Sequence, residues 1–91
     1  MSQIPRLKRG DKICVTWIDS FTPNHSDWMA EDDLDEHMGT GVTIETLGTY
    51  VRHDKKWLHL CASVAYIEGE ESGYLNPLTI PVGCIEKVKK L

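Results

Sequence analysis

Five side chains are candidates to anchor a binding interface, a role in which Trp, Tyr and Arg are enriched, and they are Tyr50, Arg52, Trp57, His59 and Trp28. The first four occupy alternate positions on two neighbouring segments. If both segments are strands of one hairpin, the four side chains share a face, and the guanidinium of Arg52 can stack on the indole of Trp57. We interpret this face, flanked by Trp28, as a binding surface. A competing interpretation is that residues 20–41 fold over it, with Phe21, Trp28 and Met29 as the cover, or that a second copy covers it.

Residues 19–37 form an acidic stretch with seven Asp or Glu residues and no Lys or Arg. Its carboxylates, among them Asp27, Asp32, Asp33 and Asp35 beside His25 and His37, offer oxygen ligands of the kind that Ca²⁺ prefers. The spacing is not that of an Asp-x-Asp-x-Asp-Gly loop with a later Glu. We therefore expect no metal and no other cofactor, and a solvated acidic surface that attracts a basic protein partner at long range.

His59 and Cys61 place an imidazole and a thiol on the same side of one segment. An imidazole favours the nucleophilic thiolate, but no third orienting group or oxyanion donor accompanies this pair. The three cysteines, Cys14, Cys61 and Cys84, also lack the close spacing of structural zinc sites, and they are typical of thiols in a reducing compartment. We expect no enzymatic activity.

Basic residues gather near both ends of the sequence, as Arg6, Lys8, Arg9, Lys87, Lys89 and Lys90. Side by side, the ends would form a narrow patch that could hold phosphate while bases stack on the aromatic side chains. Lysines on an edge strand also discourage aggregation. Nucleotide or nucleic-acid binding is therefore the alternative to protein binding.

The elements that must position these side chains are mostly strands. Residues 12–19, 42–53, 57–68 and 74–80 are rich in β-branched and apolar residues and are separated by turn signals. Residues 1–11 form a lead-in, and residues 20–41 form a long acidic connection with a short helix over 27–37 as an alternative. Pro81 and Gly83 predict a tight 3₁₀ turn before a last strand over 85–89, for which a helix is the alternative.

The apolar pattern predicts which faces point inward. The even positions of the strand over 57–68 share its inner face, and they are Leu58, Leu60, Ala62 and Val64. In the preceding strand, the apolar residues change from even to odd positions beside Gly48. This change predicts a bulge or bend there and places Leu47, Thr49 and Val51 inward. A tight turn at Asp54-Lys55 pairs residues whose numbers sum to 109 or 111. Either sum leaves Tyr50, Arg52, Trp57, His59 and Cys61 on the outer face.

Composition bounds the protein to one small domain over residues 1–91. The chain has 91 residues, 41% of them apolar, and a formal charge of −4, which removes the broad positive field of nonspecific nucleic-acid or membrane binders. There is no run of about eighteen apolar residues and no apolar signal-peptide core. We expect a cytoplasmic protein without membrane contact.

The order of these elements resembles an SH3-like small barrel, with Sm-like barrels as near relatives. The stretch Tyr74-Leu75 to Ile80-Pro81-Val82-Gly83-Cys84-Ile85 is similar to the end of such barrels. The chain also resembles small uncharacterised phage and prophage proteins, through Val15-x-Trp17-x-Asp19-Ser20, the loop Trp28, and Ile80-Pro81-x-x-x-Ile85. The loop tyrosines and acidic specificity loop of peptide-binding SH3 domains have no counterpart here.

These resemblances imply an all-β protein with a five-stranded SH3-like barrel, encoded by a phage or prophage. They assign no chemistry to it. Together with the aromatic and basic face, they favour a non-catalytic protein-interaction module that also forms homo-oligomers.

Overall fold

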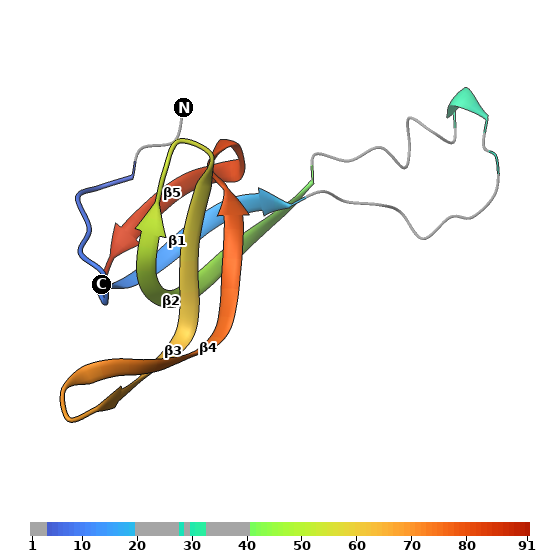
Figure 1. Cartoon of the computed structure of the whole chain (residues 1–91). Coiled ribbons are helices and arrows are strands. Elements are labelled where there is room, and N and C mark those ends of the chain that lie inside the picture. The colour runs from blue at the N-terminus through green and yellow to red at the C-terminus, as the bar shows by residue number, and fades with distance from the viewer. Residues whose placement is uncertain (1–3, 20–27, 29, 33–40) are drawn as a thin grey trace.

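The computed structural model describes residues 4–19, 28, 30–32 and 41–91, and it contains five strands and one 3₁₀ turn (Figure 1). In chain order they are β1 (Lys12–Asp19), β2 (Val42–His53), β3 (Trp57–Ile67), β4 (Glu70–Pro81), η1 (Val82–Cys84) and β5 (Ile85–Lys90). All five predicted strands and the predicted 3₁₀ turn are confirmed. Most of the predicted connection at residues 20–41, with its alternative helix, lies outside the described residues.

Strand β4 begins four residues earlier than predicted because the turn before it is shorter. Glu68 and Gly69 both have positive φ angles, 50° and 84°. A two-residue turn with this backbone matches the twist of the strands that it joins. Ile67 and Glu70 therefore pair directly across the turn, and residues 70–73 continue as strand rather than as loop.

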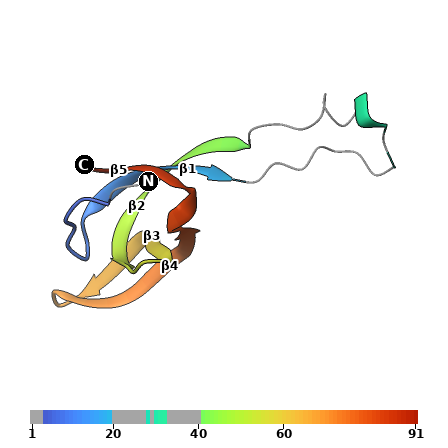
Figure 2. The same cartoon turned by 90° about the horizontal axis from the view of Figure 1, so that it is seen from above.

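The strands form one antiparallel sheet in the order β4-β3-β2-β1-β5. Strand β2 pairs with β1 along residues 42–49 and with β3 along residues 49–53, so it serves both halves of the sheet. The sheet curves strongly at this point (Figure 2). This confirms the all-β class, while β4 and β5 remain the two edges of an open sheet, and the predicted closure into a barrel is not observed.

The concave side of the curved sheet holds the hydrophobic core. Its buried members come from all five strands: Ile13, Val15, Tyr50, Leu58, Leu60, Ile80, Ile85 and Val88. Ile4 and Leu7 from the lead-in, with Trp17 and Val82, pack against this cluster. The inward position of Leu58 and Leu60 is confirmed. Ala62 and Val64 were predicted on the same face, but Ala62 is exposed and Val64 is only partly buried, because β3 leaves the core at this point. Cys61, which was predicted on the outer face, is only 2% exposed.

The face assigned to Tyr50 is corrected by a bulge in β2. Near the turn, the numbers of two paired residues add to 111, as for Arg52 and His59. For Tyr50 and Leu60 the numbers add to 110. The register shift between Tyr50 and Arg52 inserts one extra residue, which reverses the facing of everything before it. Tyr50 is therefore only 7% exposed and belongs to the core, not to the outer face.

Strands β2 and β3 approach each other closely at Gly48, and this contact corrects the predicted inward position of Leu47. A methyl group built on Gly48 would lie 2.6 Å from Leu60 Cδ1, so the Leu60 side chain occupies the space beside this glycine. The neighbouring Leu47 points away and is 69% exposed, which makes its predicted inward position wrong. Thr49 is buried, but it lies on the same side of β2 as Leu47, where its Oγ1 accepts a hydrogen bond from Lys12 Nζ, and Val51 is partly buried.

Beyond Cys61 and Pro77, β3 and β4 continue as a two-stranded arm that projects past the core (Figure 1). The arm exposes large apolar side chains, namely Tyr66, Ile67, Tyr74 and Leu75. It is held to the lead-in by Arg9, whose Nε donates a hydrogen bond of 3.0 Å to Glu71 Oε2. None of the described residues forms a helix of the length and apolarity required to cross a membrane.

Candidate functional site

Three of the five predicted binding residues lie on one face of the β2–β3 hairpin. Arg52 is directly opposite His59, and Trp57 lies two positions before His59 on the same strand. Alternate residues of a strand share a face, so these three side chains are neighbours. Trp57 is 43% exposed and Arg52 is exposed, whereas His59 is partly buried. We name Arg52, Trp57 and His59 the hairpin face.

The hairpin face is extended by strand β4. Thr79 pairs with His59 across the β3–β4 ladder, and its Oγ1 is hydrogen-bonded to His59 Nδ1 at 2.9 Å. This contact fixes the orientation of the imidazole and leaves its Nε2 atom as the remaining ring nitrogen for a ligand. Pro81 pairs with Trp57 in the same way.

A cleft of about 300 Å³ adjoins the hairpin face. It is lined by residues of three strands and the lead-in: Arg9, Val51, Arg52, His59, Leu60, Cys61, Tyr74, Pro77, Leu78 and Thr79. Leu78 is partly exposed in it, and Cys61 is only 2% exposed. A cavity of this size, mostly apolar with a few polar groups, suits a single large side chain of a ligand.

Arg9 and Tyr74 form one wall of this cleft, and Glu71 is hydrogen-bonded to both of them. The Arg9 guanidinium lies 5.4 Å from the centre of the Tyr74 ring and donates a hydrogen bond to its hydroxyl. The Tyr74 hydroxyl in turn donates to the Glu71 carboxylate. The hydrogen bond from Tyr74, followed by that from Arg9, holds the pKa of Glu71 below its ordinary value of 4.5.

The turn that carries the hairpin face is built around Asp54. Its carboxylate accepts hydrogen bonds from the backbone amides of Lys56 at 2.8 Å and Trp57 at 2.9 Å. These amides hold the pKa of Asp54 below its ordinary value of 3.8. The turn closes with a bond from the Asp54 amide to the Trp57 carbonyl. Asp54 therefore sets the backbone from which Trp57 projects.

The other two predicted binding residues are not part of this face. Tyr50 is buried, its hydroxyl is hydrogen-bonded to His53 Nδ1 at 2.7 Å, and burial raises the pKa of the phenol. The side chain of Trp28 is fully exposed, so among the described residues it packs neither on the hairpin face nor on any other surface. The other two residues of the suggested cover, Phe21 and Met29, lie outside the described residues.

Two other groups of candidate residues, the His59–Cys61 pair and the basic residues near both ends of the chain, are held by contacts within the protein. The Cys61 thiol is buried, and the Nδ1 atom of His59 is engaged by Thr79. Among the basic residues near the ends, Lys90 Nζ lies 3.5 Å from Asp11 Oδ2 and Arg9 is paired with Glu71. The predicted basic patch is therefore partly neutralised.

Sequence reasoning missed Arg9, Tyr74 and the β4 residues 77–79 of the cleft. No local signal points to them, because the lead-in meets the arm only in the folded chain. Within the described ranges there is no group of three His, Cys, Asp or Glu side chains that could hold a metal ion. Of the acidic residues of this stretch, Asp19, Glu31 and Asp32 fall among these ranges.

Comparisons of the chain with protein-family models, with curated proteins and with solved structures find no match.

Proposed function

We propose that this chain is a non-catalytic interaction module, a small β protein of SH3-like type that binds a segment of another protein on the hairpin face. The observation that carries the proposal is the exposed Trp57, which shares one face of the hairpin with Arg52 and His59, and these two residues line a mostly apolar cleft. Trp and Arg are the side chains most enriched among the energetic anchors of protein interfaces.

The rigidity of this surface supports a binding role. Asp54 holds the turn below Trp57, and Thr79 holds the ring of His59. Side chains that are already ordered lose less conformational entropy when a ligand binds. The backbone of Trp57 and the ring of His59 are therefore held in place before a partner arrives.

The likeness to an SH3 barrel enters this proposal as a comparison of strand order. Along the chain, such barrels share with this protein a first strand, a long connection, three strands joined by tight turns, and a 3₁₀ turn before the last strand. A phage or prophage origin and self-association of the chain stay predictions. Light scattering behind size exclusion measures the second.

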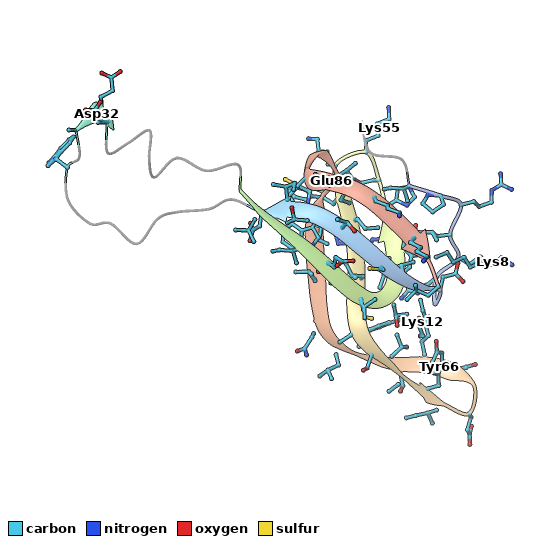
Figure 3. The ribbon with its side chains drawn as sticks, turned by 180° about the vertical axis from the view of Figure 1, so that it is seen from behind. Lys8, Lys12, Asp32, Lys55, Tyr66 and Glu86 are labelled. Carbon is cyan, nitrogen blue, oxygen red and sulfur yellow. The ribbon has the colours of Figure 1, made fainter. Side chains whose placement is uncertain are left out.

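Selection from a random library of displayed peptides tests the proposal. We expect the immobilised protein to enrich a family of peptides, and the double variant Arg52→Ala with Trp57→Ala to lose their binding. Ile67→Ala is the matched control, because Ile67 is 66% exposed and lies on the arm. The neighbouring Tyr66 and the turn residue Lys55 lie at opposite ends of β3 (Figure 3).

Two results would contradict the proposal. One is a selection that enriches no peptide although thermal unfolding shows that the protein is folded. The other is equal binding of the enriched peptides to the wild type and to the double variant.

A further inference from the structure

We infer that the segment bound by the hairpin face is an acidic peptide with a large apolar side chain. This inference rests on the proposed function and names the chemistry of the partner. It starts from the charge of the β2–β3 hairpin. Between residues 50 and 60 the chain carries three cations, Arg52, Lys55 and Lys56, and a single carboxylate, Asp54.

The one carboxylate of the hairpin does not neutralise these cations by direct contact. Asp54 accepts hydrogen bonds from backbone amides of its own turn. Within the part of the chain that the structure describes, the side chains of Arg52, Lys55 and Lys56 form no ion pair. Arg9 and Lys90, by contrast, both have carboxylate partners. The hairpin therefore presents unpaired positive charge next to the exposed Trp57.

The β4 side of the neighbouring cleft carries no charged residue. Residues 72–83, which include the β4 side of the cleft, contain no Lys, Arg, Asp or Glu. The cleft has room for about 300 Å³ and is lined there by Pro77, Leu78 and Thr79. A ligand that matches both features has carboxylates for the hairpin and an apolar side chain for the cleft.

The backbone of β4 favours a ligand that crosses the face over one that extends the sheet. Strand β4 is an edge, so its outer amides and carbonyls could pair with an added strand. However, Asn76 has a φ of 50°, and Pro77 has no amide hydrogen. These two residues interrupt the edge beside the cleft, as protected edges commonly do.

The sign of the partner differs from the expectation that the sequence raised. A basic partner was expected from the acidic stretch at residues 19–37, most of which lies outside the described residues. The described binding surface carries the opposite sign. Three cations are also few for a nucleic acid, because affinity for a polyanion comes from neutralising many phosphates.

Fluorescence anisotropy with four labelled probes tests the inference. Three are 12-residue peptides that are identical except at four positions, filled with Glu, Gln or Lys, and that share two Leu residues. The fourth is a 12-nucleotide oligothymidine. We expect the Glu peptide to bind about tenfold more tightly than the Gln peptide and the Lys peptide to bind most weakly, with the difference shrinking at high salt.

Charge reversal supplies the matched comparison. The double variant Arg52→Glu with Lys55→Glu should invert the order, so that the Lys peptide binds most tightly. The control is Lys87→Glu with Lys89→Glu on β5, which makes the same change in net charge on exposed residues and should keep the order of the wild type.

The remaining outcomes overturn the inference in distinguishable ways. If the Lys or Gln peptide binds wild type most tightly, or if no peptide of the three binds while the library selection succeeds, the partner is not acidic and the proposed function stands. If the selection also fails, both fall. If oligothymidine binds more tightly than the Glu peptide and is lost on charge reversal, the surface recognises nucleic acid instead.

Discussion

Adding one methyl group at Gly48 should destabilise the protein, because the inner side of β2 has no room for it. A Cβ atom at this position would lie 2.6 Å from Leu60 Cδ1 and 3.0 Å from the backbone oxygen of Cys61. Carbon atoms in good contact are about 3.5–4.0 Å apart. The substitution Gly48→Ala therefore requires a shift of about 1 Å between β2 and β3.

The size of the effect follows from what surrounds the methyl group. Leu60 is 2% exposed and cannot turn into solvent, and the second clashing atom belongs to the backbone. Overpacking of this kind costs about 1–3 kcal/mol. Replacing glycine by alanine also restricts the unfolded chain, which returns about 0.4–1 kcal/mol. We expect a net loss of about 1–2 kcal/mol in the free energy of unfolding.

Urea unfolding followed by circular dichroism measures this loss, with Gly73→Ala as the control. Gly73 also lies in a strand and has a negative φ, but a methyl group there would only touch Ala65 Cβ at 4.0 Å. We expect the control to be neutral or slightly more stable than wild type. In a background of Leu60→Val, which lacks Cδ1, Gly48→Ala should cost less than it does alone.

Equal urea midpoints for Gly48→Ala and Gly73→Ala would refute the close approach of β2 and β3 that places Leu60 against Gly48. Strict additivity of Gly48→Ala and Leu60→Val would show that the cost arises elsewhere.

Three further predictions concern the core, the turn and the thiols. Leu58→Ala should lower the free energy of unfolding by about 2–5 kcal/mol because Leu58 is fully buried, whereas Leu47→Ala should change it by less than about 0.5 kcal/mol. Similar urea midpoints for the two variants would contradict the inward and outward assignments. Because the pKa of Asp54 is lowered in the folded state, its contribution to stability is present above its ordinary value of 3.8 and is lost as the pH falls through the lower, folded value. Asp54→Asn should therefore flatten the acid limb of a stability profile measured from about pH 6 to about pH 2, and an unchanged limb would argue against the bonds from the turn amides. Iodoacetamide should modify the partly buried Cys14 before the buried Cys61, as peptide mass spectrometry of the folded protein can follow. Modification of Cys61 first would indicate that the cleft opens in solution.

The strands were predictable because their signals are local. Alternating apolar residues and turn signals such as Asp54-Lys55 located five strands and the 3₁₀ turn. The face of the strand on which Tyr50 lies was not predictable in this way, because the prediction assumes one constant register along the whole hairpin. The bulge between Tyr50 and Arg52 changes that register, and nothing in the local sequence marks it.

The candidate site was predictable in part for the same reason. Arg52, Trp57 and His59 lie close to the turn, where the register is set by that turn alone. The wall formed by Arg9 and Tyr74 depends on a contact between the lead-in and the arm. The two residues are far apart in sequence, and no pairing rule joins such segments, so only the folded chain reveals them.

The pairing of β1 with β5 has a consequence for how the chain reaches its native state. Val15 lies opposite Val88, and the backbone amide of Leu91 donates to the carbonyl of Lys12. Contacts between such distant parts of a chain are slow to form. During synthesis β1 emerges long before β5, so one edge of β1 stays open until the rest of the domain has been made. An open edge with a buried-type apolar face is prone to mispairing. Rapid dilution from denaturant at low protein concentration should therefore recover more native protein than refolding at high concentration.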